Sequence, residues 1–92
     1  MTKAERKQYV IDHTLILDRE ELKNEIIKAI EEVEEGFDFI GNIRHYIMKK
    51  KELIQFNCHL EVVHAVRELV YEGRIAKIEI DKFNDLYKKI EK

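Results

Sequence analysis

The chain has 92 residues, of which 45% are hydrophobic and 39% charged, and its formal net charge is −2. This length fits one small domain, and the periodic spread of apolar residues argues against wholesale disorder. Pro, Ser and Trp are absent, and Gly is scarce, which favours a few long elements over many short strands. A single cysteine excludes an internal disulfide, and no apolar run approaches the roughly 20 residues that span a bilayer. We therefore expect a cytoplasmic protein that does not enter the membrane.

The first seventeen residues fit two alternatives. Thr2 followed by Glu5 has the pattern of a capping box, which predicts a short helix from Lys3. Residues 8–17, however, are rich in β-branched and aromatic side chains and could form a strand. The sequence leaves both possibilities open.

A helix over residues 19–35 is predicted by a capping pattern and an apolar stripe. Asp18 and Glu21 form the capping pattern. Leu, Ile and Val then recur at helical spacing along one face. Gly36 is placed to end this helix in a left-handed conformation.

Two further helices are predicted, over residues 39–51 and 58–72. Asp38 is the expected cap of the first and Asn57 of the second. Gly73 is the preferred residue just past a helix end, so we expect it to lie at positive φ.

The remaining residues predict one strand and one more helix. Residues 74–80 alternate apolar and polar side chains, as a strand does. Asp81 is the expected cap of a C-terminal helix, which has one apolar stripe consisting of Phe83, Leu86, Tyr87 and Ile90. This stripe predicts a symmetric homodimer in which the helix takes part; alternatively, it packs on its own domain.

The segment HLEVVHAVRELVYEGRIAKIEI, residues 59–80, resembles the recognition helix and first wing strand of winged helix-turn-helix proteins. The shared feature is the turn Leu69-x-x-x-Gly73-x-Ile75, and with the two preceding helices the resemblance covers roughly residues 18–80. It implies a mostly helical α+β fold with a winged-helix-like three-helix core, a small strand element and a C-terminal helix.

The whole chain is expected to form one such domain, over residues 1–92. No glycine-rich turn follows Ile80, so the hairpin of a full wing is not predicted. A partner for the predicted strand could come from residues 37–39 or 9–17.

The resemblance implies DNA binding, in a transcriptional regulator, through the outer face of the helix over residues 58–72. His64 and Arg67 could donate to base edges, and the lysines at the end of the preceding helix could hold phosphates. The candidate DNA-binding residues are Asn42, His45, Lys49, Lys50, Lys51, His64 and Arg67.

The same helix face permits a second function. Its flanking Glu61, Glu68 and Glu72 disfavour a phosphate-lined groove. Exposed apolar and aromatic side chains are instead typical of a protein interface, which would make the chain an adaptor or inhibitor. The candidate interface residues are Leu60, Tyr71, Phe83 and Tyr87. A third alternative is an ordinary solvated helix face.

The sequence predicts no catalytic site, cofactor or metal site. His59 and His64 are five residues apart, whereas two zinc-binding histidines on one helix are usually four apart. The three glycines are scattered, so no phosphate-binding loop is present. Without serine, a serine-based triad is excluded. A non-enzymatic protein is therefore expected.

Overall fold

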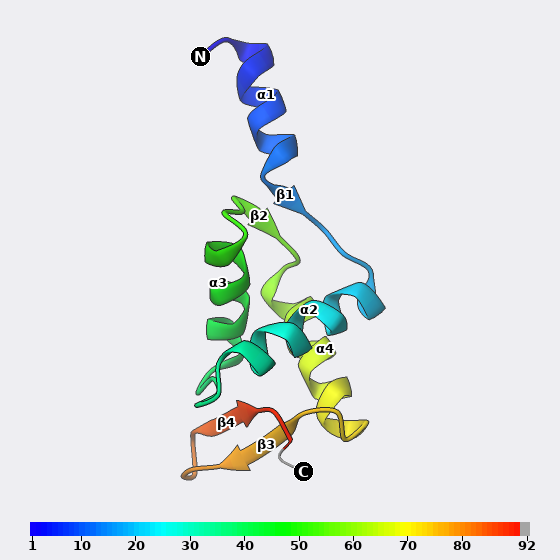
Figure 1. Cartoon of the computed structure of the whole chain (residues 1–92), viewed down its shortest axis with the longest axis vertical. Coiled ribbons are helices and arrows are strands. Elements are labelled where there is room, and N and C mark those ends of the chain that lie inside the picture. Colours follow the sequence, from blue (N-terminus) through cyan, green and yellow to red (C-terminus); the bar gives the residue numbers. More distant parts are fainter. Residues whose placement is uncertain (91–92) are drawn as a thin grey trace.

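The structure is a computed structural model that describes residues 1–90, in which four helices accompany two small two-stranded sheets (Figure 1). The predicted class, a mostly helical α+β fold, is confirmed. No helix in the described part of the chain has the length and apolar character needed to cross a membrane. The elements in chain order are α1 (Lys3–Asp12), β1 (Thr14–Leu15), α2 (Arg19–Glu32), α3 (Ile40–Lys50), β2 (Gln55–Phe56), α4 (His59–Tyr71), β3 (Ala76–Glu79) and β4 (Asp85–Lys88).

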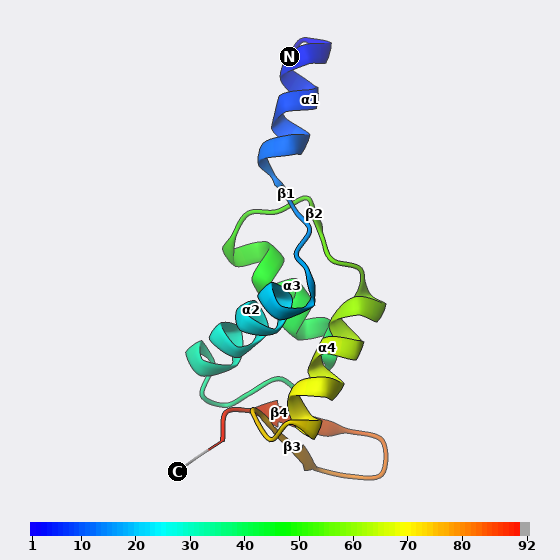
Figure 2. The same ribbon diagram turned by 90° about the vertical axis from the view of Figure 1, so that its right-hand side faces the viewer.

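The core forms where α2, α3 and α4 pack together (Figures 1 and 2). Each helix contributes apolar side chains at a spacing of three or four residues, so that one stripe of each turns inward. A fully buried aliphatic side chain of this kind contributes about 1.5–3 kcal/mol relative to an exposed one. The largest fully buried members are Leu22, Ile26 and Ile30 of α2, Ile43 of α3, and Val62, Val66 and Leu69 of α4.

The start of the chain contains both of the predicted alternatives in part, a short helix from Lys3 and then a short strand. The capping box is formed, because the Glu5 amide donates to Thr2 Oγ1 at 3.1 Å and the Glu5 carboxylate accepts from the Thr2 amide. The helix ends at Asp12, and β1 then pairs in parallel with β2. No residue of α1 is buried, and the helix projects from the body of the protein (Figures 1 and 2).

The start of α2 is confirmed, but its predicted end is wrong. The Asp18 carboxylate accepts a hydrogen bond from the Glu21 amide at 2.9 Å. The helix stops at Glu32, because Val33 takes an extended conformation. Gly36 therefore does not cap α2. It lies at φ +80° in the following loop, where the chain passes close to β4.

The predicted caps of α3 and α4 are also wrong. Asp38 accepts from the Asn42 side chain at 3.0 Å, and the N-cap position of α3 belongs to Phe39, which makes no side-chain capping bond. Asn57 is fully buried, and its amide group exchanges two 2.8 Å hydrogen bonds with the backbone of Leu17. Asn57 therefore fixes the segment after β1 to the start of α4.

The end of α4 agrees with the sequence. The helix runs to Tyr71, and Gly73 lies at φ +71° just beyond it. The Arg74 amide then donates to the Leu69 carbonyl at 2.9 Å, so the chain turns back toward β3.

The predicted C-terminal helix is wrong, because the chain makes a β-hairpin there. Strands β3 and β4 pair antiparallel, with Ala76 opposite Lys88 and Glu79 opposite Asp85. The Asp81 carboxylate accepts from the amides of Phe83 and Asn84 at 2.9 and 3.0 Å, which closes the turn. An aspartate that caps a helix accepts the same kind of hydrogen bond, so the sequence signal fits either structure.

Strand β4 also pairs on its other side with the loop that follows α2. Phe37 and Tyr87 exchange two backbone hydrogen bonds of 2.8 Å. Tyr87 is 9% exposed and belongs to the core, whereas Phe83 at the hairpin turn is 85% exposed. The predicted homodimer helix, in which these two residues shared one stripe, is therefore absent.

Candidate nucleic-acid interface

One face of α4 is open to solvent along the length of the helix. Its side chains recur at spacings of four, three and four residues, so they form a single stripe opposite the buried face. Leu60 is 62% and Tyr71 94% exposed, and His64 and Arg67 between them are also exposed. We call Leu60, His64, Arg67 and Tyr71 the α4 stripe.

The glutamates of α4 lie on the flank that faces α2. Glu68 contacts Arg19 at 2.6 Å and Lys23 at 3.0 Å. Glu72 contacts Lys23 at 3.0 Å and Arg74 at 3.5 Å. Each of these two carboxylates is therefore shared between two cations.

Glu61, about two turns before Glu68, lies in the first turn of α4. Its carboxylate accepts from the side-chain amide of Asn57 at 2.7 Å and from Cys58 Sγ at 3.4 Å. The hydrogen bond from Asn57 lowers the pKa of Glu61, with a smaller contribution from Cys58. Both donors precede α4, and no cation among the described residues forms an ion pair with this carboxylate.

The pKa shifts agree with this pairing. The hydrogen bond from Lys23 lowers the pKa of Glu68, and the nearby Arg19 adds to the effect. The pKa of Lys23 is raised by Glu72 and by Glu68. Charges paired at such short range offset each other's field, so these glutamates oppose an approaching phosphate less than their number predicts.

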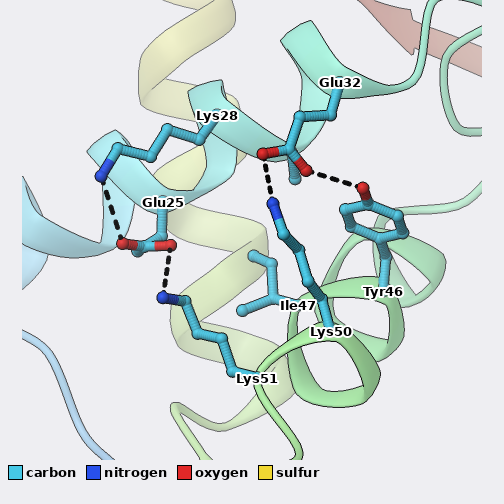
Figure 3. Close-up of a pocket in the computed structure, with 8 residues that line it drawn as sticks. Glu25, Lys28, Glu32, Tyr46, Ile47, Lys50 and Lys51 are labelled. Atoms are coloured by element: carbon cyan, nitrogen blue, oxygen red, sulfur yellow. Dashed lines mark hydrogen bonds and ion pairs between the residues drawn. The ribbon is translucent and has the colours of Figure 1, made fainter.

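The three lysines that end α3 do not act as a group. Lys50 forms an ion pair with Glu32, which also accepts from the Tyr46 hydroxyl at 2.7 Å. Lys51 lies 3.5 Å from Glu25. Figure 3 shows both lysines directed into the hollow between α2 and α3. Lys49 is exposed, and the described part of the chain provides it with no ion pair.

The ion pairs of Lys50 and Lys51 hold α3 against α2. The structure therefore turns Lys50 and Lys51 toward acidic residues of α2. Lys49 is the one member of the triplet that has no such partner among the described residues.

A groove separates α4 from the β3–β4 hairpin. Two adjoining hollows share the side chains of Ile40, Arg67, Asp85 and Tyr87, with Arg67 of the α4 stripe at the centre. The helix α3 contributes through its start, since Gly41 packs near the His59 ring, and Asn42, His45 and Lys49 do not line the groove.

The hairpin adds positive charge beside the groove. Residues 74–90 contain five basic and three acidic side chains. At the turn, the Lys82 ammonium lies 5.7 Å from the centre of the Phe83 ring, and on the strands Lys77 lies 3.7 Å from Asp85. Lys77, Lys82 and Asp85 could not be assigned to the site from the sequence, because the second strand was not predicted. An Asp-x-Phe-Asn turn followed by alternating side chains was the available signal.

Comparison with protein-family models, with curated proteins and with solved structures gave no match.

Proposed function

We propose that the chain is a small winged-helix DNA-binding protein, a transcriptional regulator that places the α4 stripe in the major groove. The observation that carries the proposal is the pairing of Glu68 and Glu72 with cations on the far flank of α4. This pairing leaves an outer face whose hydrogen-bonding side chains are His64 and Arg67. The order α2, α3, α4 and hairpin supports the proposal, because a winged helix-turn-helix protein has three helices followed by a two-stranded wing.

Each group in the proposed interface has a distinct task. Arg67 has the fork geometry that reads guanine through two hydrogen bonds, and His64 is one turn away on the same stripe. Lys49 on α3 and Lys82 at the hairpin turn are the proposed phosphate contacts, since phosphate contacts set the register on the duplex. The proposal includes no catalysis and no cofactor. It places the protein in the cytoplasm, where a free thiol such as Cys58 stays reduced.

A protein partner is the second candidate, and the aromatic side chains around the groove favour it. Tyr71 and Phe83 are almost fully exposed at its two ends, and Phe39 is also exposed. Exposed aromatics beside a groove are typical anchors of a protein interface. Leu60, Tyr71 and Phe83 therefore remain the surface of this alternative, an adaptor or inhibitor, while the buried Tyr87 is excluded from it.

Selection of bound duplexes from a random pool, followed by salt titration of the binding constant, tests the proposal. The affinity of the wild-type chain should fall as salt rises, because bound phosphates release counterions. Arg67→Ala should relax the preference at one base position by about 1–3 kcal/mol. Lys28→Ala is the control, because it removes one positive charge from an exposed site on α2 that is outside the Glu68 and Glu72 cluster.

Two results would count against DNA binding. One is a wild-type chain that shows no salt-dependent affinity for any duplex in the pool. The other is an Arg67→Ala variant that binds the selected duplex as the wild type does. Either result would favour the protein partner.

A further inference from the structure

Strand β3 is the outer strand of the C-terminal hairpin, and no described residue pairs with its outer edge. Strand β4, by contrast, is paired on both sides, because Tyr87 also bonds to Phe37. Three of the four residues of β3 are exposed, and the strand lies at the end of the molecule opposite α1 (Figures 1 and 2). An open strand edge presents unpaired backbone N–H and C=O groups, which another strand can bind.

The register of the hairpin determines which backbone groups of β3 face outward. The Ile80 amide donates to the Asn84 carbonyl at 3.0 Å, so these two residues form a hydrogen-bonded pair. Hydrogen-bonded and non-hydrogen-bonded pairs alternate along an antiparallel ladder. Ile78 is therefore bonded within the hairpin, whereas the backbone groups of Lys77 and Glu79 point away from β4.

The outward-facing residues of β3 are self-complementary about Ile78. Lys77 precedes Ile78 and Glu79 follows it, and both side chains lie on the same face because successive side chains of a strand alternate. In an antiparallel pair with a two-fold axis at Ile78, Lys77 lies opposite Glu79 of the second copy, and symmetry repeats this pair. The outward backbone groups of the two residues then meet in register, so each pair also exchanges both of its hydrogen bonds.

We propose that β3 pairs antiparallel with β3 of a second copy, so that the two hairpins form one continuous sheet in a symmetric homodimer. Two-fold dimers are the commonest soluble oligomers, and their interface joins one surface patch to its own copy. The proposal does not depend on what the α4 stripe binds.

The charges of the hairpin favour a second copy as the added strand. A lysine on an edge strand usually opposes pairing with another chain. Here Glu79 lies directly opposite Asp85 within the hairpin, which is an unfavourable pair of like charges. Glu79 has no ion pair among the described residues, and Lys77 of a second copy supplies the missing cation.

The same charges select the orientation and the register. A parallel pair in register would place Lys77 beside Lys77 of the second copy, and an antiparallel axis at Lys77 or at Glu79 would oppose each residue to itself. Like charges directly opposite each other are destabilising. An axis between two residues would bring an outward backbone group against one that is bonded within the hairpin. The axis at Ile78 avoids both problems.

The other face of the paired strands is apolar. Ile78 is 44% and Ile80 58% exposed in the single chain. In the proposed dimer, Ile78 meets Ile78 of the second copy, and Ile80 lies opposite its Ala76. Pairing of the strands therefore removes from water some of the apolar surface that one chain leaves exposed, which stabilises the dimer.

Sedimentation equilibrium of the full chain over a range of concentrations tests the proposal. The wild type should approach twice its 11.1 kDa mass as the concentration rises. Glu79→Lys should raise the dimer dissociation constant by about tenfold or more, because lysines then face each other in both symmetry-related pairs. Within the chain, the same variant places a lysine opposite Asp85, so its hairpin should be at least as stable as that of the wild type. Adding Lys77→Glu should restore the dimer.

The control for net charge is Asp12→Lys, which makes the same change of charge on an exposed residue of α1 and should leave the dimer intact. Amide hydrogen exchange then identifies the surface that is buried. The amides of Lys77 and Glu79 should exchange more slowly as the protein concentration rises, whereas the amide of Ile78 is bonded within the hairpin in both states and should change much less.

Four results would overturn the proposal. The first is a wild type that stays monomeric at the highest attainable concentration. The second is a dimer that Glu79→Lys leaves intact, or that the exchange of both charges does not restore. The third is a dimer that Asp12→Lys dissociates. The fourth is a dimer in which exchange at Lys77 and Glu79 does not depend on protein concentration, since its interface would then lie elsewhere.

Discussion

The ammonium group of Lys23 on α2 lies 3.0 Å from a carboxylate oxygen of Glu68 on α4, and the Lys23 side chain is only 4% exposed. Glu72, the residue that follows α4, lies at the same distance from this ammonium group. The contacts fix the rotation of α4 about its axis, because both glutamates must face α2. The exposed face of α4 is therefore determined partly by a residue of another helix.

We expect this cluster to make stability depend on pH in the acid range. Glu68 has a lower pKa in the folded protein than its ordinary value of 4.5, so the folded state binds fewer protons than the unfolded state. Lowering the pH below about 5 therefore favours unfolding. In the Lys23→Met variant the free energy of unfolding should decrease less as the pH is lowered, as measured by urea unfolding at a series of pH values. Lys28→Met, which removes an exposed lysine, should keep the wild-type slope, and equal slopes for all three proteins would contradict the account.

Two glycines at positive φ should differ in their tolerance of a side chain. Gly73→Ala should cost about 1 kcal/mol, since the penalty is conformational and no atom lies within 4 Å of the added Cβ. At Gly36 the added Cβ would lie 2.6 Å from the Tyr87 carbonyl oxygen, so the loop must also shift. We expect Gly36→Ala to cost more than about 2 kcal/mol in chemical denaturation. Equal losses would mean that β4 does not pack against this loop.

Phe83 and Tyr87 provide a test of the hairpin. A helix would place these residues, four apart, on one stripe, whereas in the hairpin Phe83 is exposed and Tyr87 is buried. Phe83→Ala should change the free energy of unfolding by less than about 0.5 kcal/mol. Tyr87→Ala should lower it by about 3 kcal/mol or more, as large aromatic truncations in a core do. Similar values for both variants would favour the helix.

Substitutions of Lys49 and Lys50, at the end of α3, should have different effects on the salt dependence of DNA binding. Lys49→Ala should reduce the slope of log affinity against log salt by about one phosphate contact. Lys50→Ala should leave that slope unchanged, because its ammonium group is bound by Glu32, and should lower the melting temperature instead. Similar salt slopes for the two variants would remove Lys49 from the proposed interface.

Much of the helical part of the fold could be predicted from the sequence. The apolar spacing and the Asp18 capping pattern gave the start of α2, and Gly73 gave the end of α4. These features are local, because a cap or a left-handed glycine acts within one or two turns of its own position. The end of α2 and the start of α3 were predicted less accurately, since Gly36 does not cap the first helix and Asp38 does not cap the second.

The features that change the candidate site could not be predicted locally. The hairpin was missed because the Asp81 signal is shared by helix caps and turns. The pairing of Glu68 and Glu72 was missed because their cations come from α2. The three consecutive lysines suggested one basic patch, yet Lys50 and Lys51 turn toward acidic residues of another helix.

The two hydrogen bonds between Phe37 and Tyr87 also bear on the order of folding. They join a loop to the C-terminal hairpin, whereas α2, α3 and α4 each pack against the other two and contain most of the buried core residues. We therefore expect α2, α3 and α4 to assemble first and β4 to join them last. In hydrogen exchange under native conditions, the amides of Phe37 and Tyr87 should then open together, at a lower free energy than the amides of the α4 interior.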